Sequence, residues 1–140
     1  MKDGDYYKFV VSGIPRGFVA VNWKGFVPDS VKKRVADYKD FRDRVVVAAR
    51  QARLCTPVEA DSQYIVHVET TAYFKNGVHS DPENVHKGLV DSLFYGTNGL
   101  GDKWTGGWFA APLYDREKPR VEVTIECFSP GRYKKEVLDA

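Results

Sequence analysis

The residue types best suited to chemistry lie close together between Ser80 and Phe94. Their charged and amide members are Asp81, Glu83, Asn84, Lys87 and Asp91. On a helix with about 100° of rotation per residue, Asn84, Lys87 and Asp91 share one face. The apolar stripe lies on another face and comprises Val85, Leu89 and Leu93. With two acids at the helix entrance, the stretch gathers up to three carboxylates, an amide and an ammonium in one small region.

Helix capping explains part of this pattern. Ser80 and Glu83 have the spacing of a capping box, in which the serine accepts from a backbone N–H and the glutamate reaches back. Pro82 in the first turn and acids near the N-terminus also suit a helix start. Capping does not explain why Lys87 and Asp91 continue along one face. A structural and a functional interpretation therefore both stay open at this point.

The functional interpretation is a divalent-cation site that acts on a phosphodiester. Mg²⁺ prefers oxygen ligands, and it often uses one or two carboxylates together with waters and phosphate oxygens. A bound Mg²⁺ activates water and neutralises a phosphodiester transition state, and an ammonium stabilises a developing oxyanion. Asp81, Glu83 and Lys87 supply these parts, and one more carboxylate from elsewhere in the fold would complete the site.

The elements that position this stretch are predicted from the apolar pattern along the chain. The expected strands span Tyr6–Ser12, 63–74, 108–114 and 119–128, and the expected helices span 28–53 and Pro82–Phe94. The order strand, helix, strand, helix, strand, strand predicts an α+β fold, in which a mixed β-sheet packs against two main helices. A length of 140 residues indicates one domain.

Charge is distributed unevenly in a chain whose formal net charge is only +2. Residues 28–53 hold eight basic and four acidic side chains. This helix is either a solvated face with internal ion pairs or a face that contacts phosphates. The start of the chain lacks the apolar core of a signal peptide, and no stretch is long enough to span a bilayer. We therefore expect a cytoplasmic protein with no membrane partner.

Histidine and tryptophan patterns are less informative. The three histidines, His67, His79 and His86, lack the spacing of a metal triad. The sequence favours His86 as a packed or surface residue on the flank of the apolar stripe. Trp104 and Trp108 suit either base stacking or core and dimer contacts. The pattern leaves open whether Glu69, on the expected central strand, approaches the carboxylates.

The run from Asp81 to Leu93 resembles the signature of the RusA-type Holliday junction resolvases, usually Asp-x-Asp-Asn-x-x-Lys-x-x-x-Asp-Ala-Leu. In that family a loop with a further aspartate follows, and a β-hairpin closes the domain. Here Asp102 lies in the matching loop, and residues 120–125 resemble the family's last strand. The resemblance implies that residues 1–140 form a single RusA-like endonuclease domain.

RusA-type enzymes are homodimers that resolve four-way junctions with Mg²⁺ or Mn²⁺ through paired symmetric nicks, and the resemblance implies the same activity here, with a prophage origin. It implies that Asp81, Glu83 and Asp102 are metal-site carboxylates. Lys87 would be the catalytic lysine near the scissile phosphate. Asp91 would be a further ligand or a structural acid tied to Lys87 one turn away. The expected DNA-contacting side chains are Lys32, Lys33, Arg34, Lys39, Arg42 and Lys103.

Two departures from the signature keep other functions open. The second acid is Glu83 where the family usually has aspartate, and the loop aspartate Asp102 is single, followed by Lys103. Octahedral Mg²⁺ tolerates little displacement of its ligands. One alternative is a relative that binds branched DNA without cutting it. Another is a flap or replication-fork endonuclease, and a purely structural protein is the last.

Overall fold

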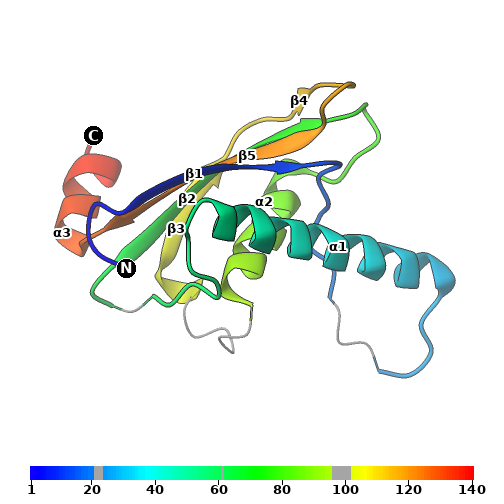
Figure 1. Cartoon of the computed structure of the whole chain (residues 1–140), viewed down its shortest axis with the longest axis horizontal. Helices are drawn as coiled ribbons and strands as arrows, with labels where there is room; N and C mark the ends of the chain where they lie inside the picture. The colour runs from blue at the N-terminus through cyan, green and yellow to red at the C-terminus, as the bar shows by residue number, and fades with distance from the viewer. Residues whose placement is uncertain (21–23, 61, 96–101) are drawn as a thin grey trace.

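Figure 1 shows the computed structural model, which describes residues 1–20, 24–60, 62–95 and 102–140. In chain order the strands are β1 Tyr6–Ser12, β2 Ile65–Phe74, β3 Thr105–Phe109, β4 Leu113–Tyr114 and β5 Arg120–Phe128. The helices are α1 Asp29–Gln51, α2 Pro82–Phe94 and α3 Pro130–Tyr133. A 3₁₀ turn, η1 Asp102–Trp104, precedes β3, and a π-helical turn, η2 Lys134–Leu138, follows α3.

The strands form one mixed sheet, as the α+β prediction requires. Its order is β1-β5-β2-β3, and β4 pairs with the far end of β2. β5 lies antiparallel to both β1 and β2, whereas β3 and β4 run parallel to β2. β2 is therefore the central strand, and it carries side chains to both faces of the sheet at alternate positions.

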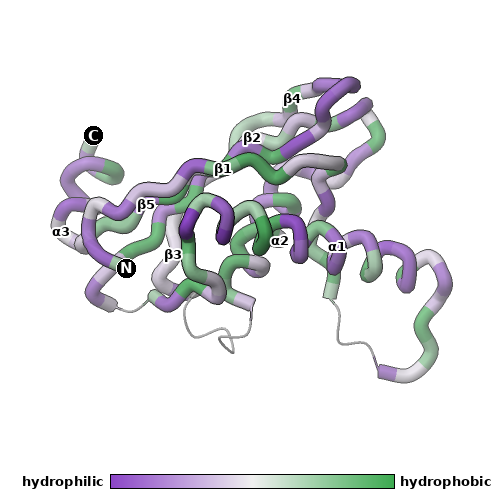
Figure 2. The backbone as a smooth tube through the Cα atoms, viewed as in Figure 1, coloured by the Kyte–Doolittle hydropathy of each residue, from purple (hydrophilic) through white to green (hydrophobic). Residues whose placement is uncertain are grey.

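The core lies between one face of the sheet and the two main helices. α1 contributes Val31, Tyr38, Phe41, Val45 and Ala49 as buried residues. α2 contributes its stripe of Val85, Leu89 and Leu93, as the helical spacing predicts. The sheet meets them with alternate residues of β2 and β5, among them Val66, Val68, Val123 and Ile125. Figure 2 shows hydrophobic and hydrophilic residues alternating along α1, the pattern of an amphipathic helix.

Element boundaries agree best where the signal is local. β1 and α2 have the predicted bounds, and α1 begins one residue after Pro28. α1 ends before Arg53 because that residue adopts a positive φ of 69°, which does not continue a right-handed helix. The single strand expected over 108–114 is wrong. Two short strands replace it, and Pro112 between them has no N–H to offer a ladder.

The chain ends in helical turns that the sequence pattern did not predict. Pro130 opens α3, and Arg132 then binds the carboxylates of Asp3, Glu126 and Glu136. These ion pairs fasten the C-terminal turns to β5 and to the start of the chain, so both termini lie at the same end of the sheet (Figure 1). In the described part of the chain, no helix combines the length and apolar character needed to cross a bilayer.

Candidate functional site

The first turn of α2 is capped by Asp81. Its Oδ1 accepts a hydrogen bond of 2.7 Å from the backbone N–H of Asn84, and Pro82 fills the first turn. The capping box expected from Ser80 is therefore wrong. The Ser80 hydroxyl instead accepts a bond from the backbone N–H of Gly17, at 3.2 Å. One oxygen of Asp81 is engaged in capping, and this exposed carboxylate can offer its other oxygen to a ligand.

Asn84 fastens an extended segment of the chain across α2. Its side-chain nitrogen donates to the carbonyl of Phe18 at 3.1 Å, and its own carbonyl accepts from the N–H of Phe18 at 3.1 Å. Gly88, one turn later, allows this close packing. A methyl group there would lie 2.9 Å from a ring carbon of Tyr38 and 3.2 Å from the nitrogen of Phe18. The segment is thus held where the Phe18 ring overhangs the helix.

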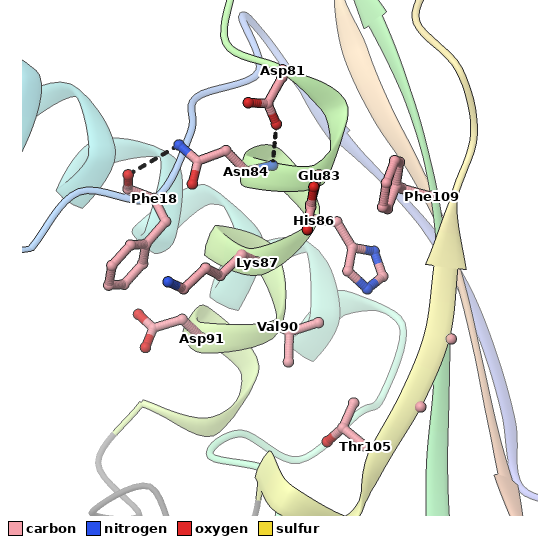
Figure 3. A pocket seen from close by; sticks show the side chains of 12 residues that line it. Phe18, Asp81, Glu83, Asn84, His86, Lys87, Val90, Asp91, Thr105 and Phe109 are labelled. Atoms are coloured by element: carbon pink, nitrogen blue, oxygen red, sulfur yellow. Dashed lines mark hydrogen bonds between the residues drawn. The ribbon is translucent and has the colours of Figure 1, made fainter.

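An open cleft of about 710 Å³ follows the exposed side of α2. α2 and its cap contribute Asp81, Glu83, Asn84, His86, Lys87 and Asp91 to the lining, together with Val90. Phe18 forms one wall, and β3 forms the other with Thr105, Gly106, Gly107 and Phe109. Figure 3 shows Lys87 directed toward Phe18 and His86 directed toward Phe109. Four of the site residues expected from sequence, Asp81, Glu83, Lys87 and Asp91, therefore share one cleft.

Lys87 lies between two acids at helical spacing without pairing with either. Its ammonium nitrogen lies 4.5 Å from the ring centroid of Phe18. Among the residues that the structure describes, no carboxylate lies within 4.0 Å of it, although Glu83 and Asp91 are four residues away on either side. The positive charge therefore faces the cleft, where an anionic ligand would meet it.

Asp91 is held from α1. The Tyr38 hydroxyl donates to Asp91 Oδ2 at 2.5 Å and also lies 3.3 Å from the carbonyl of Gly88. Burial and the Asp91 carboxylate both raise the pKa of Tyr38, so the phenol keeps its proton and remains a donor. Of the two roles expected for Asp91, the structural one involves Tyr38, since no ion pair joins Asp91 to Lys87 among the described residues.

The carboxylate oxygens of the cleft are the type of ligand that a hard cation prefers, but the described residues supply only a few of them. Asp81 and Glu83 are both exposed to the cleft, and two carboxylates suffice for an ion that keeps waters. Within residues 1–20, 24–60, 62–95 and 102–140, no group of three His, Cys, Asp or Glu side chains is arranged to hold a metal. Asp102 opens η1, but its side chain lies outside what the structure describes.

Among the described residues, one buried polar atom in the cleft wall has no hydrogen-bond partner. The hydroxyl oxygen of Thr105 is buried, and no hydrogen-bond partner for it exists in the described part of the chain. A buried hydroxyl without a partner carries a cost of about 1–3 kcal/mol. Thr105 belongs to the cleft wall at the start of β3, although its hydroxyl oxygen is itself shielded from solvent.

Two residues that the sequence left unplaced lie on the opposite face of the sheet. Glu69 accepts a bond from Thr124 at 3.3 Å, and Trp108 packs edge-on against His67. Neither lines the cleft, because successive residues of β2 and β3 alternate between faces. His86, expected as a packed or surface residue, does line it. Its Nδ1 lies 2.8 Å from the hydroxyl of Thr70 on β2.

The expected DNA-contacting residues lie outside the cleft lining. Lys32, Lys33, Arg34 and Lys39 are exposed on the N-terminal half of α1. Lys32 pairs with Asp29 at 3.8 Å and Lys33 with Asp37 at 3.1 Å, as the solvated-face interpretation expects. The other two candidates contact rings. Arg42 lies 3.8 Å from the ring centroid of Tyr95, and Lys103 lies 5.4 Å from that of Trp104.

No protein-family model matches this chain, and a search of curated proteins found no relative. The likeness to RusA-type resolvases therefore rests on the residues of the chain itself. The DNA substrate, the metal and the dimer that this likeness implies are accordingly proposals, to be weighed against the geometry of the cleft.

Proposed function

We propose that this protein is a divalent-metal-dependent DNA endonuclease that resolves Holliday junctions by paired symmetric nicks. One observation carries the proposal. Asp81, Glu83, Lys87 and Asp91, which occupy the signature positions, line one open cleft, and the ammonium of Lys87 is not neutralised by either neighbouring acid. The spacing along the helix would allow Lys87 to pair with either acid, but its ammonium lies beside the Phe18 ring instead.

The cleft supplies complementary parts for phosphodiester hydrolysis. Asp81 and Glu83 would hold Mg²⁺ or Mn²⁺, with Asp102 as the further expected carboxylate and Asp91 as the weaker candidate. When bound, the metal supplies a polarised water and charge neutralisation at the phosphate. Lys87 donates to the phosphate oxygen that gains charge in the transition state.

The proposed dimer matches the symmetry of the substrate. A four-way junction has approximate two-fold symmetry, and a closed homodimer has the same symmetry. One small domain offers one cleft, so two coordinated nicks need two copies of the chain. The exposed cations of α1, above all Arg34 and Lys39, would contact phosphates of the junction arms, with Lys32, Lys33, Arg42 and Lys103 as further contacts.

The direct test uses a synthetic mobile four-way junction with purified protein and either Mg²⁺ or Mn²⁺. We expect symmetric nicks in opposing strands, and a dimer by light scattering. The Glu83→Gln and Asp102→Asn proteins should bind the junction without cutting it. Glu117→Gln is the matched control, because Glu117 is exposed in the turn between β4 and β5, away from the cleft. Unchanged cleavage by both the Glu83→Gln and the Asp102→Asn proteins would overturn the assignment.

A second candidate is a relative that binds branched DNA without cleaving it. It is favoured by the two departures from the signature, Glu83 in place of aspartate and the single loop aspartate Asp102. Junction binding at low salt without nicking under either metal would select this function. Comparing four-way, three-way and flap substrates at matched salt separates the resolvase from the flap or fork endonuclease expected as a further alternative.

A further inference from the structure

The imidazole of His86 lies in the same cleft as the carboxylates and Lys87, on the β3 side of α2 (Figure 3). Its Nδ1 lies 2.8 Å from the hydroxyl oxygen of Thr70 on the neighbouring strand β2. Thr70 is only 4% exposed, so water does not compete for this hydrogen bond. A buried partner therefore holds one ring nitrogen and fixes the orientation of the ring.

The other ring nitrogen is available to a ligand. Within the part of the chain that the structure describes, His86 Nε2 has no hydrogen-bond partner. Burial, and to a smaller degree the nearby His67, lowers the pKa of His86, so the ring is neutral at pH 7. When Nδ1–H donates to Thr70, the lone pair of a neutral ring resides on Nε2.

His86 also lies beside the groups assigned to the phosphate. It follows Glu83 by three residues and precedes Lys87 by one, and residues three apart on a helix are neighbours on its surface. Glu83 therefore stands between the His86 side and the Lys87 side of the cleft. A water that attacks a phosphate near Glu83 comes within reach of Nε2. Neutral imidazole is the commonest general base in such an arrangement.

We propose that His86 is the general base of the hydrolysis and that Thr70 is the residue that positions it. This inference rests on the proposed endonuclease function. As the water oxygen bonds to phosphorus, Nε2 takes a proton from that water, and the bond from phosphorus to the leaving oxygen breaks. The leaving alkoxide takes a proton from solvent, and His86 returns its own proton to the resulting hydroxide. The net reaction adds one water across the phosphodiester.

The first experiment needs neither metal nor activity. Long-range ¹H–¹⁵N spectra of the metal-free protein at pH 7.5 report which nitrogen of His86 carries the proton. We expect the proton on Nδ1 in the wild type and in Thr70→Ser, and a shift toward Nε2 in Thr70→Val, which removes the acceptor. A wild-type ring with its proton on Nε2 would overturn the base assignment, because that nitrogen would then have no lone pair to offer.

The second experiment measures junction cleavage. His86→Ala should lose about 100-fold in rate at saturating DNA while it keeps its junction affinity. Added imidazole should restore part of that rate, whereas a purely structural defect would not respond to it. His79→Ala is the matched control, since His79 bonds Ser80 and Tyr114 outside the cleft. His86→Gln, which retains a polar side chain, provides a second loss-of-base variant if His86→Ala unfolds.

The outcomes separate the two proposals. If the wild type cuts junctions and neither His86 variant slows it, the base assignment fails and the endonuclease stands. If a slowed His86→Ala protein gains nothing from imidazole and melts earlier, His86 is structural and the proposal fails. If the wild type cuts no branched DNA with either metal, the endonuclease proposal fails, and the proposed role of His86 fails with it.

Discussion

Both main helices carry opposite charges three or four residues apart, yet only α1 pairs them. On α1, Lys33 meets Asp37 at 3.1 Å and Arg44 meets Asp40 at 3.1 Å. On α2, Lys87 has an acid four residues away in each direction and, within the described residues, an ion pair with neither. Spacing that allows a pair is therefore not sufficient to form one. On α2, groups from elsewhere in the fold engage the charged side chains instead.

The difference has a structural cause. Phe18, fastened by Asn84, lies beside the Lys87 ammonium, and the Tyr38 hydroxyl engages Asp91. α1 projects its charged side chains into solvent, where pairing along the helix is the available interaction. Exposed pairs of this kind contribute about 0.3–0.5 kcal/mol each. The charges of α2 line a cleft, so their separation leaves them available to a bound ligand.

The largest expected effect comes from removing Lys87, the α2 cation that has no ion pair among the described residues. Lys87→Met should lower the rate of junction cleavage at saturating DNA by about 10²–10³-fold, because it removes a donor to the developing negative charge. Lys33→Met on α1, whose ammonium is already paired, should leave that rate unchanged. Single-turnover cleavage assays give both values. Equal losses in the two variants would abolish the distinction between the helices.

The next effect concerns the tyrosine that holds Asp91. Tyr38→Phe should lower the free energy of unfolding by about 1.5–3 kcal/mol, because a hydrogen bond to a charged group is lost. Urea denaturation measures this change. Tyr95→Phe is the matched control, since Tyr95 is exposed and contacts Arg42 with its ring, which phenylalanine retains. A Tyr38→Phe protein as stable as the control would mean that α1 does not hold the acid.

A smaller effect is expected on DNA affinity from the exposed cations of α1. Arg34→Ala and Lys39→Ala should each weaken junction binding to a similar degree whatever the DNA sequence of the junction. Each should also reduce the slope of log K against log salt by about 1 if one phosphate contact is lost. Titrations across several salt concentrations measure that slope. An unchanged slope in both variants would assign α1 to stability alone and leave DNA binding to other surfaces.

The smallest effect tests the paired charges themselves. Lys33→Ala should cost about 0.2–0.5 kcal/mol of unfolding free energy, the usual contribution of a helical pair at this spacing. Urea denaturation at low and at high salt measures it, and salt should reduce the cost. A loss comparable to that of Tyr38→Phe would contradict the view that α1 pairs are weak and solvated.

Prediction from sequence succeeded where the signal is local. The bounds of β1 and α2 come from an aromatic and β-branched run and from a proline followed by an apolar stripe. It failed where a distant partner decides. Ser80 and Asp81 are both good capping residues. The N–H of Gly17 donates to the Ser80 hydroxyl, and Asp81 caps the helix. The sequence placed His86 on the flank of the apolar stripe of α2. Its contact with Thr70 could not be predicted, because Thr70 belongs to a different element, β2.

The short strands near the C-terminus show the same limit. β3 begins at Thr105 because Gly106 and Gly107 pair with β2. At Gly107 a methyl group would clash with the carbonyl oxygen of Val68, 1.8 Å away. Glycine has low intrinsic strand propensity, and the pattern predicted a strand that begins only at Trp108. Pairing with a neighbouring strand overrode that preference.

Residue types and their spacing were enough to define the α+β class, the apolar stripes of the two helices and the helical face that holds Asn84, Lys87 and Asp91. These features depend on the 3.6-residue and 2-residue periods of helix and strand, which can be read along the chain. The folded arrangement alone settled which charges pair, which histidine enters the cleft and which face of β2 carries Glu69. Those outcomes depend on contacts between residues far apart in the chain, such as Tyr38 with Asp91 and Phe18 with Lys87, and no local period encodes them.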